Sequence, residues 1–219
     1  MSNDISLIAF LAFSTLLPFL VASGTCYIKF SIVFVMVRNA LGLQQIPSNM
    51  TLNGVALLLS LFVMMPIAKD IYVNAKNENV DPSSVESVSQ FVETGLDGYR
   101  TYLQKYSDPE LTRFFNKAQA SRKDSEVDVS REEEKASIFA LLPAYALSEI
   151  KSAFKIGFYL YLPFVVVDLL ISSILLALGM MMMSPVTLSV PIKLVLFVVL
   201  DGWSLLSKGL ILQYMDLVG

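Results

Sequence analysis

Charged residues are concentrated in one stretch of this chain, and their distribution constrains the fold more than any other feature of the sequence. Residues 69–137 hold 24 of the 35 charged side chains, which leaves 11 for the other 150 residues. The whole chain is 55% apolar and 16% charged, whereas soluble domains are about 45–50% apolar and about 25% charged. A soluble core does not segregate charge in this way. The distribution therefore predicts a membrane protein with one soluble insert.

Four apolar runs are long enough to cross a membrane as helices. A bilayer core about 30 Å thick needs about 20 apolar residues in a helix. The runs cover residues 5–28, 50–68, 157–178 and 186–206. They predict an all-α membrane protein with about four long, kinked hydrophobic helices that form hairpins. Because Asp4 precedes the first run, where a secretory signal would carry Lys or Arg, we expect this run to be retained.

The loop between the first two runs sets the expected orientation. Lys29 and Arg38 lie there with no acidic residue nearby in the sequence, and basic loops stay in the cytoplasm. The insert and both termini would then face the periplasm of a bacterium. We expect three parts, namely an N-terminal hydrophobic helical hairpin (1–68), the soluble helical insert (69–137) and a C-terminal hydrophobic hairpin with a methionine-rich loop (138–219).

The insert contains two signals for helix starts. Ser83 with Glu86 is a candidate capping box, and Ser107-Asp108-Pro109-Glu110 places a proline and a carboxylate where a second helix would begin. The stretch 120–135 is almost entirely polar, and we expect a mobile loop there. A pair of helices this small has little core of its own, so we expect it to pack on a neighbour.

The residue inventory excludes several classes of function. The chain has no histidine and a single cysteine, Cys26. These counts remove Ser-His and Cys-His catalysis, haem ligation by histidine, the common zinc sites and any intramolecular disulfide. The net charge of −3 provides no basic field for nucleic acid. We expect neither enzymatic activity nor a cofactor, a metal site or a nucleic-acid partner.

Three charged residues lie inside apolar sequence, where an unpaired charge costs roughly a few kcal/mol or more. The midpoint between Asp168 and Lys193 falls within a methionine run, so a reversal of the chain there would bring them face to face. A structural ion pair, an ion or proton relay, and an interfacial position for both charges are the alternatives. Asp168 and Asp201 are also two carboxyls in neighbouring runs, as an intramembrane aspartyl protease requires. The sequence has no Gly-x-Gly-Asp element, which disfavours that interpretation.

The methionine run is the least ordinary feature of the sequence. Its members are Met180, Met181, Met182 and Met183. Methionine is unbranched and adapts to irregular contacts, and Gly179 and Pro185 on either side would break a helix. Such a run is either core filling or a seal. At a hairpin tip repeated around a symmetry axis, it would form a soft apolar plug that blocks ions and yields to a passing chain.

Three stretches follow one another in the second half of the chain. They are Pro143 to Gly157, which includes Glu149 and Lys155, then Pro163 to Asp168 leading into Gly179 to Pro185, and last Lys193 to Trp203. In this order they resemble the FliP/SctR family of inner-membrane proteins of type III export machines. The resemblance covers nearly the whole chain except about 70–135. Residues 24–42 are similar to the branch of the family that serves invasion-type injectisomes.

The resemblance implies a core component of the export apparatus in the bacterial inner membrane. It implies a pentamer with SctS-type and SctT-type subunits, joined by SctU-type and SctV-type subunits and surrounded by lipid. Unfolded effector and needle proteins would pass through the channel and gate that these subunits form. The resemblance assigns the pore gasket to Met180–Met183, and we expect Asp168, Lys193 and Asp201 to pair within or between subunits. From the residues alone, a stand-alone four-helix membrane channel or small-solute transporter is the alternative.

Overall fold

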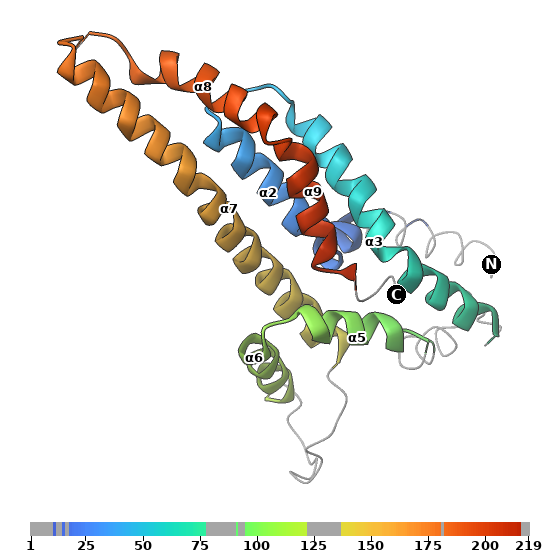
Figure 1. Ribbon diagram of the computed structural model, residues 1–219. Helices are drawn as coiled ribbons and strands as arrows, with labels where there is room; N and C mark the ends of the chain where they lie inside the picture. Colours follow the sequence, from blue (N-terminus) through green and yellow to red (C-terminus); the bar gives the residue numbers. More distant parts are fainter. Residues whose placement is uncertain are drawn as a thin grey trace. The chain divides into compact units, whose positions relative to one another are not determined.

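The computed structural model describes Leu11, Thr15, residues 18–77, Phe91 and residues 95–121, 137–180 and 182–215. Within that part of the chain every regular element is a helix, which confirms the all-α prediction. The helices are α2 (Tyr27–Ala40), α3 (Asn49–Asn77), α5 (Asp97–Tyr106), α6 (Pro109–Ala120), α7 (Ile138–Ala177), α8 (Pro185–Val199) and α9 (Gly202–Leu212) (Figure 1). The expected capping box at Ser83, nearly all of the expected loop at 120–135, and Met181 lie outside the described residues.

Two helices are long and apolar enough to cross a membrane, α3 with 29 residues and α7 with 40. Two further apolar helix pairs are each broken by a short turn. One pair joins residues 18–24 to α2, and the other joins α8 to α9 with a bend of 59°. If each broken pair is one span, the described part of the chain has up to four spans. This agrees with the expectation of about four long, kinked hydrophobic helices.

The longest helix, α7, begins well before the apolar run that was expected at residue 157. Its first residue is Ile138, and the helix continues without a break to Ala177. Charged residues at 149, 151 and 155 interrupt the apolar pattern but not the helix, because Glu and Lys are good helix formers. An apolar-run criterion detects only the part of such a helix that could face lipid.

The chain packs as two compact units. One contains Met1–Ile28 and Met64–Glu149, and the other contains Lys29–Val63 and Ile150–Gly219. The boundaries between the units fall inside α2, α3 and α7, so both units are built from parts of the same long helices. The three-part division drawn from the charge distribution concerns which segments enter the membrane, and it stays a prediction.

In the first unit, α5 packs on the first turns of α7 through tyrosines. Tyr102 and Tyr145 are buried, and their hydroxyls share a hydrogen bond. The Tyr99 hydroxyl donates to the carbonyl of Gly24 at 2.8 Å. A Cβ at Gly24 would lie 2.3 Å from that hydroxyl, so glycine is needed for this approach. Part of the expected insert is thus held against both the N-terminal segment and α7.

The start of α6 agrees with the second helix signal of the insert. Asp108 Oδ1 accepts a hydrogen bond from the Glu110 backbone N–H at 3.0 Å, and Pro109 is the first helical residue. Both features stabilise a helix N-terminus. The backbone N–H of Asp108 also donates to Ser148 Oγ at 2.7 Å, which ties the start of α6 to α7.

In the second unit, aromatic rings connect four helices. The stripe of α2 from Phe30 to Val37 is largely buried. Phe34 contacts Trp203 of α9 with ring centroids 6.1 Å apart, and Trp203 contacts Phe197 of α8 at 5.3 Å. Phe197 in turn contacts Phe164 of α7 at 6.3 Å. These rings form one core among α2, α7, α8 and α9.

Two glycines allow helices of the second unit to approach closely. A Cβ at Gly157 would lie 2.3 Å from Met36 Sδ, so α7 can pack this tightly on α2 only with glycine at that position or with Met36 displaced. Gly42 follows α2 with φ +79°, and a Cβ there would lie 2.6 Å from Val190 Cγ2 of α8. The turn after α2 is therefore packed directly on α8.

Candidate functional site

Three members of the methionine run, Met180, Met182 and Met183, lie in the turn between α7 and α8, and backbone capping fixes both ends of that turn. Gly179 adopts φ +72°, and its N–H and that of the next residue donate to the carbonyls of Leu176 and Leu175 at 3.0 and 2.9 Å. This pattern is the Schellman motif, which ends a helix. Pro185 then opens α8 at a position where proline is favoured. Figure 1 shows α7 and α8 meeting at this tip.

The described methionines of the turn do not fill the core of this chain. Met182 is fully exposed, and Met180 and Met183 are 40% and 42% exposed. The Met183 N–H donates to the Met180 carbonyl at 3.2 Å, which closes the turn through the backbone alone. Exposed apolar side chains at a conformationally fixed tip are typical of a surface that is used in assembly.

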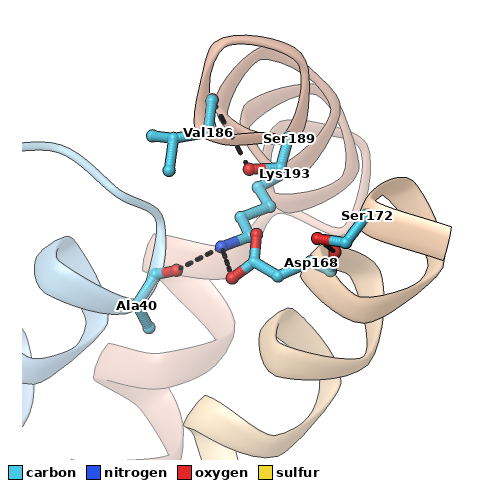
Figure 2. A network of polar contacts seen from close by, with 6 residues as sticks. All are labelled: Ala40, Asp168, Ser172, Val186, Ser189 and Lys193. Atoms are coloured by element: carbon cyan, nitrogen blue, oxygen red, sulfur yellow. Dashed lines mark hydrogen bonds and ion pairs between the residues drawn. The ribbon is translucent and has the colours of Figure 1, made fainter. Parts of the chain in front are cut away.

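Behind the tip, Lys193 of α8 connects three helices. Its Nζ lies 2.6 Å from Asp168 Oδ2 on α7 and donates to the Ala40 carbonyl at the end of α2, at 3.2 Å (Figure 2). The side chains of the pair differ in exposure, because Lys193 is 4% exposed and the Asp168 side chain is 41% exposed. The structure thus places these two charges as an ion pair within one chain.

The carbonyl of Ala40 explains why a cation fits at this position. The last carbonyls of a helix have no partner within the helix, and the helix dipole gives them partial negative charge. In the turn after α2, the N–H groups of Gly42 and Leu43 donate to the carbonyls of Asn39 and Arg38. Lys193 supplies a donor to the remaining Ala40 carbonyl.

Two serines close to the pair are satisfied within their own helices. Ser172 Oγ donates to the Asp168 carbonyl at 2.8 Å, and Ser189 Oγ donates to the Val186 carbonyl at 3.5 Å (Figure 2). Such bonds to the preceding turn are a common way to place a hydroxyl in apolar surroundings.

The third predicted charge, Asp201, takes no part in this pair. It lies at the break between α8 and α9, is exposed, and has the left-handed backbone angles φ 49° and ψ 46°. Its N–H donates to the Val198 carbonyl at 3.0 Å. The carboxylate of Asp168 faces Lys193, so the structure does not bring the two carboxyls together as a dyad.

The four predicted motif residues of α7 differ in their surroundings. Glu149 is 1% exposed, and its charge acts on the nearby Tyr102 hydroxyl. Gly157 is buried against Met36. Lys155 is exposed and Pro143 is half-buried. Within one chain, therefore, Glu149 has an electrostatic neighbour and Gly157 a packing contact.

A cluster of tyrosines around Tyr102 was not predicted. Its ring lies 5.2 Å from that of Tyr106 and 5.3 Å from that of Tyr145, between centroids. Burial raises the pKa of Tyr99 to about 12. Burial also raises the pKa of Tyr102, and the neighbouring Cys26 and Glu149 act in the same direction. The local signal was the spacing of residues 99, 102 and 106, but Tyr145 belongs to another helix and no local pattern links it to them.

Comparison with known proteins defines the class of this chain. The FliP family matches residues 10–210, so the chain belongs to the FliP family. The chain is 74% identical over 222 residues to the surface presentation of antigens protein SpaP of Salmonella typhimurium, with 99% of each chain covered. It is 64% identical to SpaP of Shigella flexneri, again over 99% of each chain. It is 46% identical to the Yop proteins translocation protein R of Yersinia pestis, over 97% of each chain. The resemblance to FliP/SctR and to its injectisome branch is confirmed.

Proposed function

We propose that this chain forms, with partner subunits, the inner-membrane channel through which unfolded effector and needle proteins leave the cell. The observation that carries this proposal is its family membership over almost its whole length. Relatives that align over 94–99% of the chain are named for surface presentation of antigens, Yop translocation and harpin secretion. The chain is therefore a structural component of a type III export apparatus, and not an enzyme.

The methionine turn is the proposed gasket of that channel. A hydrophobic constriction blocks ions because water does not remain in it, and unbranched thioethers can rearrange around a passing polypeptide. The Schellman motif at Gly179 and the proline at 185 hold the turn at the tip of the hairpin without using the methionine side chains. Exposure of Met180, Met182 and Met183 in the single chain leaves them available for contact with other copies.

The Asp168–Lys193 pair is the proposed brace of this gasket. It joins the two arms of the hairpin, α7 and α8, and Lys193 also bonds the end of α2. If the arms slid past each other, a buried ammonium would lose its acceptors, which is costly. The brace would therefore keep the tips of several copies at one level along the pore axis.

The proposed setting is the bacterial inner membrane, with residues 69–137 on the periplasmic side. The charge-rich composition of that stretch and the basic residues Lys29 and Arg38 support this orientation. The proposed partners are further copies of the chain, as a pentamer, and subunits of SctS, SctT, SctU and SctV type. Membership of an export apparatus implies partner components, and the stoichiometry belongs to the proposal.

The native mass of the detergent-extracted protein, alone and co-expressed with SctS-type and SctT-type subunits, tests this function. We expect a discrete assembly near five copies that grows by defined increments when partners are added. A stable monomer or dimer that ignores those partners would contradict the proposal and favour a stand-alone four-helix channel or transporter.

Ion conductance of assembled complexes tests the gasket separately. Replacement of Met181 and Met182 by alanine shortens the apolar side chains, so we expect a larger ion leak while some secretion continues. Replacement of the same residues by leucine, which nearly conserves volume, is the matched control and should leave the leak close to that of the unmodified protein. Unchanged conductance in the alanine variant would contradict the gasket role.

A further inference from the structure

In the single chain Met182 is fully exposed, and Met180 and Met183 are 40% and 42% exposed. As the lining of the proposed constriction, their thioethers would face the pore, where a dissolved oxidant can reach them. Oxidation converts methionine to its sulfoxide, and this lesion is reversible because sulfoxide reductases restore the thioether. The sulfur of Cys26, the single cysteine, is buried and therefore shielded from a dissolved oxidant.

We propose that the methionine turn is a site of reversible sulfoxidation that makes the seal permeable to ions. The inference rests on the proposed gasket function. The oxidant in this proposal is hypochlorous acid. Its oxygen is transferred to the sulfur, the O–Cl bond breaks, and chloride and a proton are released while the sulfur loses two electrons. Reduction by a sulfoxide reductase returns two electrons and two protons and releases water.

The physical consequence follows from the polarity of the product. A sulfoxide is polar and accepts hydrogen bonds, so it retains water where a thioether does not. Since Met180, Met182 and Met183 share one turn, oxidation would place several such groups at the same level of the constriction. Dewetting of an apolar constriction is what excludes ions, and polar groups there oppose it.

The turn itself would persist after oxidation. Its closing hydrogen bonds join backbone atoms of residues 175–183, and Gly179 and Pro185 set the ends of the helices. None of these interactions uses a methionine sulfur. Oxidation would therefore change the lining of the constriction while its position in the hairpin stays the same.

Another exposed methionine provides a matched control. Met50, in the first turn of α3, is 87% exposed and should be oxidised at similar doses of oxidant. It is not part of the turn between α7 and α8. Replacement of Met50 by leucine should therefore leave the response of the pore to oxidant unchanged.

The experiment measures the conductance of assembled complexes in planar bilayers before and after dilute hypochlorous acid. The complexes contain the unmodified chain, Met50→Leu, Met182→Leu, or the variant in which all four turn methionines are leucine. Peptide mass spectrometry counts the added oxygens, about 16 Da for each sulfoxide. We expect a several-fold rise in conductance for the unmodified chain and for Met50→Leu, a smaller rise for Met182→Leu, and none for the fourfold variant. A methionine sulfoxide reductase should then restore the low conductance.

Three results would overturn the inference. They are oxidation of Met50 without oxidation of the turn, oxidation of the turn without a rise in conductance, and an equal rise in unmodified and Met182→Leu complexes. If the fourfold variant does not assemble, the single Met182→Leu variant decides. The alanine variants, measured without oxidant, keep the two proposals apart. If the alanine variants leak but complexes of the unmodified chain do not respond to oxidant, only the sulfoxidation proposal is removed. If the alanine variants do not leak, the gasket proposal is removed.

Discussion

Asp168 and Lys193 face each other across the two arms of the methionine hairpin, with Oδ2 and Nζ 2.6 Å apart. The two partners are not equivalent. The lysine is buried and also bonds the Ala40 carbonyl, whereas the carboxylate is partly exposed. A buried charge without its partner is costly, while a partly exposed charge can be solvated. The structure therefore predicts that the effect of breaking the pair depends on which partner is removed.

Asp168→Asn should destabilise the chain more than Lys193→Met. The asparagine leaves a buried ammonium without a counter-charge, at a cost of about 1–3 kcal/mol, whereas methionine keeps the packing of the lysine stem and leaves a carboxylate that solvent can reach. The double variant should recover part of the loss. Thermal unfolding in detergent and the assembled fraction measure both effects. Equal losses in the two single variants that add strictly in the double variant would contradict an energetic coupling between Asp168 and Lys193.

Gly157→Val should loosen the packing of α7 on α2. A Cβ at this position would lie 2.3 Å from Met36 Sδ and 3.3 Å from Met36 Cβ, so a branched side chain forces Met36 to move. We expect a loss of about 1–3 kcal/mol in the free energy of unfolding. The matched control is Gly209→Val in α9, where a Cβ would meet no atom within 4 Å. Similar losses at both positions would show that valine acts through helix propensity alone.

Stability should fall at high pH because Tyr99 is buried. Burial raises the pKa of Tyr99 in the folded chain to about 12, above the value of about 10 in an unfolded chain. The folded state holds this proton to higher pH, so the stabilisation is complete below pH about 10 and is lost as the pH rises towards about 12. Denaturant unfolding between pH about 8 and about 11.5 measures the decline.

Tyr99→Phe is the variant that isolates this group. It removes the hydroxyl that donates to the Gly24 carbonyl, so stability at neutral pH should drop by about 0.5–1.5 kcal/mol. The decline at high pH should become shallower, although Tyr102, whose pKa is raised in the same direction, continues to contribute. An unchanged slope in Tyr99→Phe would contradict the assignment of this pH dependence.

The sequence was sufficient to predict the hairpin and the position of its tip. Long apolar runs predict helices directly, and Gly179 and Pro185 mark where one helix ends and the next begins. Because the midpoint between Asp168 and Lys193 falls within the methionine run, the expectation of a hairpin also placed them at similar depth. These inferences depend on local helix-breaking residues and on the spacing of the two charges.

The remaining partners of the site could not be predicted from local signals. The Ala40 carbonyl meets Lys193 only because α2 ends beside α8, where Gly42 packs on Val190. The tyrosine cluster likewise joins Tyr102 to a residue of another helix, Tyr145. Such contacts arise from tertiary packing of segments that are far apart in the chain.

Asp201→Asn should separate the backbone role of this residue from the role of its charge. Asp201 adopts φ 49° at the break between α8 and α9, and asparagine tolerates that left-handed conformation as well as aspartate does. The free energy of unfolding of the isolated chain should therefore change by less than about 0.5 kcal/mol. If the exposed carboxylate contacts a neighbouring subunit, as we expect, assembly with SctS-type and SctT-type partners should decrease.

The control is Asp201→Val, which should destabilise the isolated chain by about 1–2 kcal/mol because a β-branched residue is strained at positive φ. Normal assembly of Asp201→Asn would mean that Asp201 acts through its backbone conformation alone.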